Sequence, residues 1–112
     1  MDFGLARRRH LRLGRRGERM VCRLLRNLGA EVLLRNYRCP AGEIDLIARD
    51  GLTLCFIEVK TRRSGGTSRP AAGLHPRQQQ RIRRAAQTYL REIGHPAVAW
   101  RCDLYEVIFG RW

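Results

Sequence analysis

A probable hairpin is the feature that most constrains how this chain can fold. Two runs typical of β-strands, Glu43–Arg49 and Leu52–Thr61, flank the dipeptide Asp50-Gly51. This dipeptide is a preferred two-residue connection between antiparallel strands. The sequence therefore predicts a central hairpin at these positions.

The pairing of this hairpin separates its side chains into two faces. With Asp50-Gly51 as the loop, Asp45 is expected opposite Phe56 and Ile44 opposite Ile57, and side chains alternate with period two. One face is almost wholly apolar and must be buried; it carries Ile44, Leu46, Ala48, Cys55, Ile57 and Val59. The other face carries Glu43, Asp45, Ile47, Leu54, Phe56, Glu58 and Lys60. A three-residue loop would break this parity.

Helices and further strands are expected around the hairpin. The period of apolar residues predicts a helix over 17–28, stopped by Gly29, and another from Pro76 to about Ile93. The first helix is expected to bury Val21, Leu24, Leu25 and Leu28, with Met20 at the edge. The second is expected to bury Ile82, Ala85, Ala86, Tyr89, Leu90 and Ile93. Strands are expected over 31–38 and over 98–108, the latter as one bent strand or two short ones.

Strong positive charge indicates a polyanionic partner. The net charge is +13 in 112 residues, with a pI near 11.4. A field of this sign favours nucleic acid, DNA first and RNA as the alternative, although charge also serves solubility alone. The four cysteines form no C-x-x-C pair, which fits a reducing cytoplasm and argues against a zinc site. No apolar run is long enough to span a membrane.

Two segments have the composition of substrate-clamping parts. Residues 1–16 read as a basic arm, either flexible or helical only when bound, or else a plain disordered tail. Residues 17–112 are expected to form a single domain. Gly and Pro residues predict a mobile loop over 62–74.

Lysine is the rarest of the basic residues. Of the 23 basic residues, 22 are arginine, and Lys60 is the single lysine. Arginine keeps its proton in proteins, whereas the pKa of lysine moves readily, so Lys60 suits a chemical role. A Glu-x-Lys pattern alone is commonly a solvated ion pair. Asp45 and Glu58 on the same face, however, would suit Mg²⁺, the ion that phosphodiester hydrolysis uses.

A helix-borne carboxylate belongs with this group. Glu18 lies on or beside the inward stripe of the first helix, where it is either a first-turn residue favoured by the helix dipole or a ligand aimed at the sheet. The blocks that carry a wider likeness are Gly17-Glu18, residues 33–38, 42–48, 56–62, Ala85-Ala86 and Tyr89-Leu90. In these blocks the chain resembles the bacterial YraN-type family, uncharacterised proteins described as endonuclease-like, within the PD-(D/E)xK nuclease superfamily.

This resemblance implies an α/β fold, restriction-endonuclease-like, with a mixed central sheet flanked by helices. It also implies that Asp45 and Glu58, with the Val59 carbonyl and Glu18, hold Mg²⁺ or Mn²⁺, and that Lys60 is catalytic together with Asp45 and Glu58. Glu43 is the uncertain member, since it shares the face by parity yet can instead cap the turn at 40–42. Nucleic-acid contacts are expected from Arg15, Arg16, Arg62, Arg63, Arg77, Gln78 and Arg81.

Three functions remain open at this stage. The first is a metal-dependent endonuclease acting on structured or branched DNA, because the family is similar to archaeal Holliday-junction resolvases. The second is a non-catalytic nucleic-acid-binding module, and the third is a structural role in which Glu58 and Lys60 merely pair. A junction resolvase would need two sites and hence a homodimer. The interface candidates are Trp100, Phe109 and Trp112.

Overall fold

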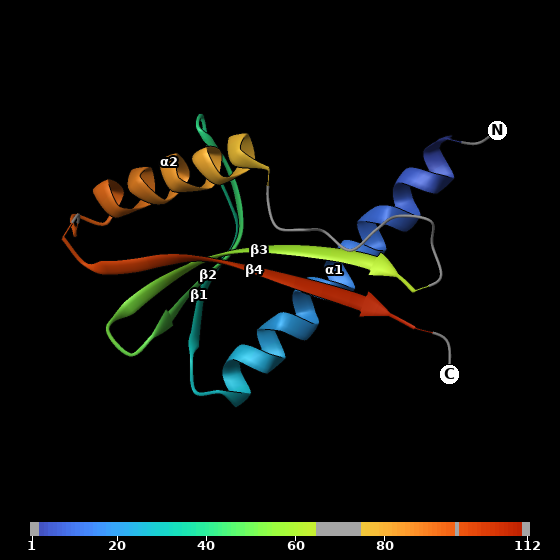
Figure 1. Ribbon diagram of the computed structural model, residues 1–112, viewed down its shortest axis with the longest axis horizontal. Coiled ribbons are helices and arrows are strands. Elements are labelled where there is room, and N and C mark those ends of the chain that lie inside the picture. The colour runs from blue at the N-terminus through green and yellow to red at the C-terminus, as the bar shows by residue number, and fades with distance from the viewer. Residues whose placement is uncertain (1–2, 65–74, 96, 111–112) are drawn as a thin grey trace.

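The computed structural model describes residues 3–64, 75–95 and 97–110. Its elements are α1 (Phe3–Asn27), β1 (Glu31–Cys39), β2 (Gly42–Asp50), β3 (Thr53–Arg63), α2 (Pro76–Glu92) and β4 (Ala99–Phe109). The four strands form one sheet in the order β1-β2-β3-β4 (Figure 1). β1, β2 and β3 are antiparallel neighbours, while β4 runs parallel to β3 after the crossover through α2. The expected α/β class with a mixed sheet and flanking helices is confirmed.

The β2–β3 hairpin forms, but its predicted register is wrong by two residues. Asp50 pairs with Thr53, so the loop is Gly51-Leu52 rather than Asp50-Gly51. Gly51 has φ +61°, which suits a two-residue turn with glycine first. Consequently Phe56 pairs with Ile47 rather than with Asp45. A shift of two residues preserves parity, so this error in register does not by itself exchange the two faces.

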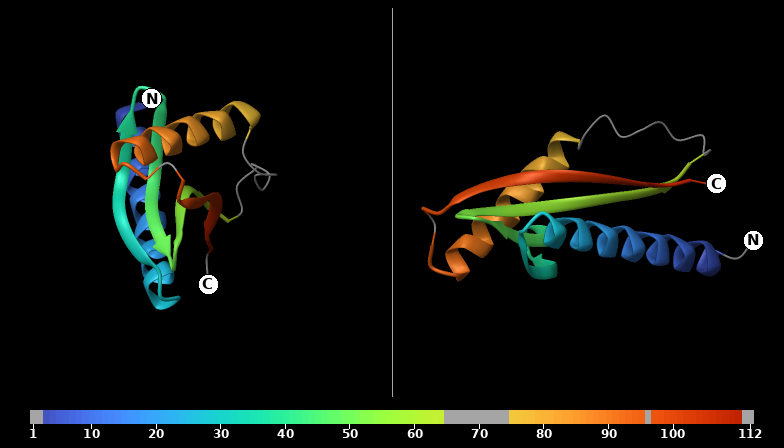
Figure 2. Two further views of the ribbon diagram at one scale, coloured as in Figure 1. Left: turned by 90° about the vertical axis from the view of Figure 1, so that its left-hand side faces the viewer. Right: turned by 90° about the horizontal axis from the view of Figure 1, so that it is seen from below.

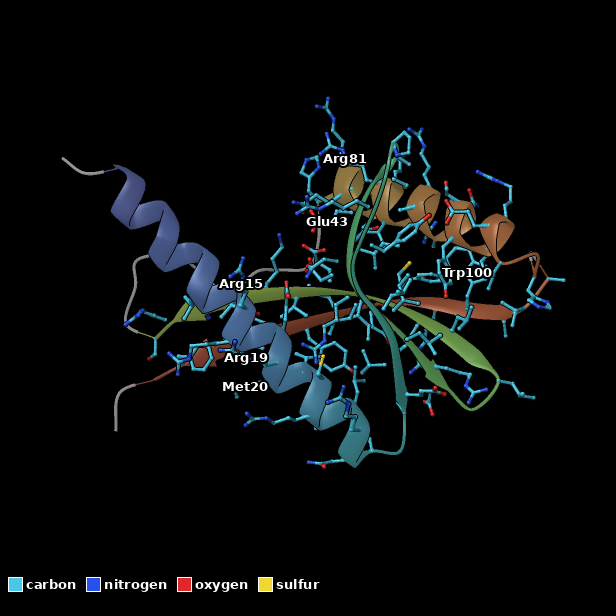
Figure 3. The ribbon with its side chains drawn as sticks, turned by 180° about the vertical axis from the view of Figure 1, so that it is seen from behind. Arg15, Arg19, Met20, Glu43, Arg81 and Trp100 are labelled. Atoms are coloured by element: carbon cyan, nitrogen blue, oxygen red, sulfur yellow. The ribbon has the colours of Figure 1, made fainter. Side chains whose placement is uncertain are left out.

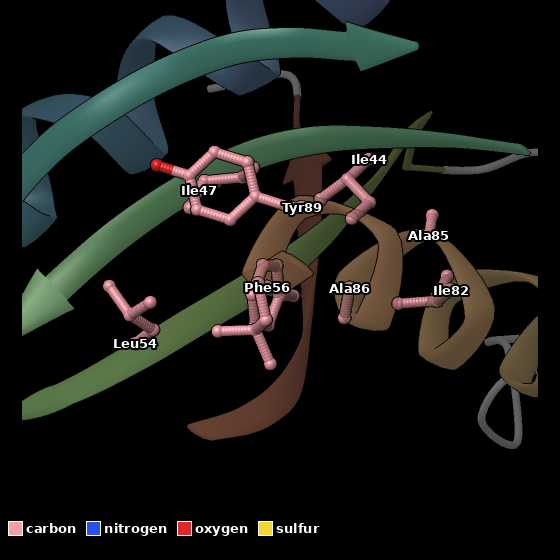
Figure 4. Packing of buried hydrophobic residues seen from close by; sticks show 9 residues of the cluster. Ile44, Ile47, Leu54, Phe56, Ile82, Ala85, Ala86 and Tyr89 are labelled. Atoms are coloured by element: carbon pink, nitrogen blue, oxygen red, sulfur yellow. The ribbon is translucent and has the colours of Figure 1, made fainter. Parts of the chain in front are cut away.

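The two helices cover opposite faces of the sheet (Figure 2). On the α2 face, Phe56 and Ile47 pack with Ile82, Ala85, Ala86, Tyr89 and Leu90 (Figure 4). On the α1 face, Leu46 and Ile57 pack with Val21, Cys22 and Leu25. Burial on both faces excludes water from the centre of β2 and β3, and hydrophobic burial of this kind is the main force that holds such layers together.

The side chains of β2 do not alternate strictly between the two faces near the start of the strand. The face expected for Ile44 is therefore wrong. Ile44 belongs to the α2-side cluster with Ile47, whereas Leu46 and Ala48 belong to the α1-side cluster. The paired residues of β2 and β3 run only from Leu46–Ile57 to Asp50–Thr53. Below Leu46 the strand is therefore free to turn relative to β3. We call the point where β2 leaves β3 the fork.

α1 is longer than expected and buries a different stripe. It begins at Phe3, so the backbone of most of the expected basic arm is helical. Leu24 and Leu28 were expected inside but are 45% and 70% exposed. Gly17 is buried instead, and a Cβ at this position would lie 2.0 Å from Thr61 Oγ1. α1 therefore packs tightly against β3 at a residue without a side chain.

α2 begins with a cap that explains its first residues. His75 is the N-cap and accepts a hydrogen bond from the Arg77 backbone N–H at 3.2 Å, while Gln78 Oε1 accepts one from the His75 backbone N–H at 3.3 Å. This reciprocal arrangement is a capping box, which satisfies donors that a helix start leaves open. The expected buried stripe is confirmed except for Ile93, which is 39% exposed.

Candidate functional site at the β2–β3 fork

Asp45 bridges the fork through its side chain. Its Oδ2 accepts a hydrogen bond of 2.8 Å from the Val59 backbone N–H. The carboxylate thereby takes a donor on β3 beyond the last residue pair between β2 and β3. This bond fixes the Asp45 side chain against the segment Glu58-Val59-Lys60, so the fork brings together the residues expected to form the site.

Glu58 lies between an acid and a base. Its Oε1 is 3.5 Å from Lys60 Nζ, and its carboxyl group is also hydrogen-bonded to that of Asp45. Burial, followed by the adjacent negative charge of Asp45, raises the pKa of Glu58 from 4.5 to about 7 against the opposing charge of Lys60. Burial also raises the pKa of Asp45, although the Val59 N–H opposes this. The fork therefore holds two closely spaced carboxyl groups whose pKa values are both raised.

Glu18 approaches the fork from α1. Burial raises the pKa of its carboxyl group, with added contributions from the charges of Asp45 and Glu43, whereas Arg35 and Arg15 lower it. Glu43 also forms an ion pair with its β1 neighbour Arg38, Oε1 to Nε 3.6 Å. Both acids thus lie within electrostatic range of Asp45, and neither is hydrogen-bonded to it in the described structure.

The donor set at the fork fits a hard divalent cation of the Mg²⁺ type. Mg²⁺ is commonly held by one or two carboxylates, with water and substrate phosphate completing the octahedron. Asp45 and Glu58 supply the two carboxylates, and the Val59 carbonyl is the neutral oxygen expected beside them. Within residues 3–64, 75–95 and 97–110, no three His, Cys, Asp or Glu side chains converge closely enough to hold an ion. Glu18 as a third acidic ligand stays a prediction.

The arginines expected to contact nucleic acid fall into two groups. Arg15, Arg63, Arg77 and Arg81 are exposed, as that role requires. Arg62 is engaged instead by Glu106, with Nε 2.6 Å from Oε1. The Arg16 guanidinium lies 4.4 Å from the centre of the Phe109 ring, which ties α1 to the end of β4. Gln78 serves the α2 cap, a role that its polar side chain alone did not reveal.

Other expectations have definite outcomes. Asp103 pairs with Arg101, Oδ2 to Nε 3.0 Å, which makes it a structural acid on β4. Trp100 packs against the α2-side core, its ring 5.8 Å from that of Phe56, so it is not a free interface residue. Residues 65–74 of the expected loop and Trp112 lie outside the described residues. In the described part of the chain, no helix has the length and apolarity to cross a bilayer.

A row of arginines on α1 was missed by inspection of the sequence alone. Arg19, Arg23 and Arg26 are exposed on the same helix as Glu18. The signal that could have found them is their spacing of four and three residues, together with Arg15. Figure 3 shows Arg15 and Arg19 on α1, with Arg81 at the start of α2.

Comparisons with known proteins identify the family of this chain. Residues 17–107 match the model of the family described as Uncharacterised protein family UPF0102. A UPF0102 protein from Streptomyces griseus is 49% identical over 100 residues, covering 88% of this chain and 84% of the relative. A UPF0102 protein from Nocardia farcinica is 46% identical over 96 residues, with coverage of 86% and 76%. A third, from Chlorobaculum parvum, is 47% identical over 98 residues, with coverage of 88% and 76%. The family expected from the sequence blocks is thereby confirmed, and the chain belongs to UPF0102.

Proposed function

We propose that this protein is a metal-dependent endonuclease of the PD-(D/E)xK type, with structured or branched DNA as its substrate. One observation carries the proposal: Asp45, Glu58 and Lys60 converge at the fork, with Asp45 fixed by the Val59 N–H at 2.8 Å and Glu58 3.5 Å from Lys60. Close carboxyl groups beside a half-exposed lysine are the components that phosphodiester hydrolysis needs. The net charge of +13 favours the polyanionic substrate.

Each residue at the fork has a definite task in this proposal. Asp45 and Glu58 would hold Mg²⁺ or Mn²⁺, which when bound supplies Lewis-acid stabilisation of charge on the phosphate oxygens. Lys60, whose side chain is 39% exposed, can reach a solvent molecule or a phosphate oxygen beside the carboxylates. It would orient or deprotonate the attacking water, or neutralise the charge that develops. Glu18, on α1, would be a further acidic side chain beside the two carboxylates.

A specific observation also favours the non-catalytic alternative. The described residues offer no group of three acidic or imidazole side chains for an ion, and Glu58 is already paired with Lys60. A module that binds nucleic acid by charge needs neither the metal nor the lysine chemistry. The two functions differ in whether Lys60 affects turnover, so the experiment addresses this residue.

The test is cleavage of labelled linear, flapped and four-way DNA with Mg²⁺ or Mn²⁺. Wild type is compared with Lys60→Ala and Lys60→Arg, and with Arg49→Ala as a matched control at a cation held by Glu31 far along the hairpin. We expect Lys60→Ala to lose cleavage by about 10²-fold or more, with DNA affinity nearly unchanged. Partial activity of Lys60→Arg would assign charge neutralisation, and none would assign proton transfer.

Three outcomes would count against the nuclease. Equal rates for wild type and Lys60→Ala would mean that the observed cleavage does not come from the fork. Binding without cleavage of any substrate by wild type, with either ion, would favour the non-catalytic module. Loss of thermal stability in Lys60→Ala with no change in affinity or cleavage would favour the purely structural pair.

A further inference from the structure

One strip along the exposed side of α1 consists of arginines. Successive residues of an α-helix are rotated by about 100°, which places Arg15, Arg19, Arg23 and Arg26 within a sector of about 80°. All four side chains are exposed. The row rises about 16 Å along the helix. We call these four residues the α1 arginine face; farther toward the N-terminus, Arg8 and Arg12 continue the same spacing in sequence.

Acidic residues are scarce beside this face. None of the ion pairs found among the described residues involves any of its four arginines. Glu18, the single acid in Phe3–Asn27, lies toward the fork. Like charges at spacings of three and four residues destabilise a helix by about 0.2–0.5 kcal/mol per pair. Solubility alone is served by mixed charges, so an unbalanced row indicates an anionic partner.

The chemistry of the face fits a phosphate backbone. A guanidinium group binds a phosphate through two parallel hydrogen bonds, and all four cations here are arginine rather than lysine. The α1 segment 13–27 contains no aromatic residue on which an unpaired base could stack. A straight helix also presents its charges at fixed intervals, which matches the stiff strands of a duplex better than a flexible single strand.

The face adjoins the candidate site. Glu18 is about 60° around the helix from Arg15, and the charge of Arg15 acts directly on the Glu18 carboxyl group. A polyanion that contacts the face therefore passes beside the fork. By contrast, Arg83, Arg84 and Arg91 lie on α2, which covers the other face of the sheet. They offer a matched set of exposed helical arginines away from this path.

We infer that the α1 arginine face binds the phosphate backbone of double-stranded nucleic acid without reading its sequence, and leads it to the fork. This inference rests on the proposed function only for the direction of the path, because binding by the face does not require cleavage. The described backbone of residues 3–27 is one continuous helix, so the contacts extend along its length.

The experiment compares two charge-matched triple variants of the full chain. One carries Arg19→Gln, Arg23→Gln and Arg26→Gln; the other carries Arg83→Gln, Arg84→Gln and Arg91→Gln. Affinity for duplex DNA, duplex RNA and single-stranded DNA is measured by fluorescence anisotropy in EDTA at several salt concentrations. Each phosphate contact contributes about 0.9 to the slope of log K against log salt for duplex DNA. We expect the α1 variant to reduce that slope by about 2–3 and the α2 variant to reduce it by well under 1.

The outcomes separate this inference from the nuclease proposal. Equal reductions of the slope in both variants would show a general charge effect and overturn the inference. An unchanged slope in the α1 variant, or a loss of affinity confined to single-stranded DNA, would also overturn it. The preferred duplex, DNA or RNA, identifies the geometry that the face fits. A failure of wild type to cleave leaves the binding result intact. Because the α1 substitutions relieve like-charge repulsion, the melting temperature of the α1 variant should not fall below that of wild type. A melting temperature measured to be unchanged or higher would exclude unfolding as the cause of the weaker binding.

Discussion

The close contact between α1 and β3 makes Gly17→Ala the sharpest test of the packing that positions Glu18. A Cβ at residue 17 would lie 2.0 Å from Thr61 Oγ1 and 3.1 Å from both Thr61 Cβ and Cγ2. Carbon and oxygen atoms that are not bonded normally approach to about 3.4 Å or more. Thr61 is β-branched and sits on a strand, so its side chain has little freedom to rotate away. The helix must therefore move off the sheet.

The expected magnitude combines two opposing effects. Inserting a methyl group into a filled contact typically destabilises a protein by about 1–3 kcal/mol. Alanine favours a helix interior over glycine by about 1 kcal/mol. Since the contact is far inside the normal separation, we expect a net loss of about 1–2 kcal/mol, or a fall in melting temperature of about 4–8 °C. In an unstrained contact the same substitution would be stabilising.

Thr61→Ala supplies the control. The free energies of unfolding of wild type, the two single variants and the double variant are measured by urea denaturation as a double-mutant cycle. Thr61 Oγ1 is buried and has no hydrogen-bond partner among the described residues, so its removal sacrifices no hydrogen bond. In the Thr61→Ala background, Gly17→Ala should be neutral or stabilising, which gives a coupling free energy of about 1–3 kcal/mol. Equal destabilisation by Gly17→Ala in both backgrounds would refute the reasoning, because the loss would then not come from this contact.

Three further results are expected. Since the pKa of Glu58 is raised from 4.5 to about 7, its stabilising contribution is present below pH 4.5 and lost as the pH rises through 7. Glu58→Gln should match wild type in its free energy of unfolding near pH 4.5 and exceed it at pH 8 by about 1 kcal/mol, after allowance for partial solvation; a constant difference across this pH range would contradict it. Mn²⁺ or Mg²⁺ at ten times its dissociation constant should raise the free energy of unfolding of wild type by about 1.4 kcal/mol and leave that of Asp45→Asn unchanged, as measured by scanning calorimetry. Equal stabilisation of both proteins would place the ion elsewhere. Gln78→Ala should lower the free energy of unfolding by about 0.5–1 kcal/mol, because Gln78 is part of the α2 cap, while the affinity for DNA and its salt dependence stay constant. A loss of DNA affinity without a loss of stability would instead support the phosphate contact expected for Gln78.

Much of this arrangement could be predicted from the sequence, because local patterns determine it. The apolar alternation around Phe56 and the helical period around Ala85 and Ala86 gave the sheet and α2 correctly. Parity placed Asp45, Glu58 and Lys60 on one face even though the hairpin register was wrong by two residues. Patterns with a period of two are insensitive to an even shift, so the register error did not exchange the faces of β3. Asp45 lies where the alternation of β2 fails, and its hydrogen bond to the Val59 N–H is what joins it to this group.

What the sequence did not reveal depends on tertiary contacts. Leu24 has the spacing of a buried residue, but α1 is rotated by the approach of Gly17 to Thr61, which buries Cys22 and exposes Leu24. Ile44 changes face because β2 leaves β3 at the fork, and no local signal marks where two strands separate. Arg62 is a residue type that commonly binds phosphate, but the sequence did not reveal its ion pair with Glu106, which is distant along the chain.

Lys60 has a consequence for experiments that goes beyond catalysis. Because the chain has one lysine, apart from the terminal amine it carries a single primary amine, and the Lys60 side chain is 39% exposed. Reductive methylation with ¹³C-formaldehyde would therefore place one isotopic label at the fork without any substitution. Its NMR shift would report the protonation of the neighbouring carboxyl groups, the arrival of a divalent ion and the approach of a polyanion, each in the native chain.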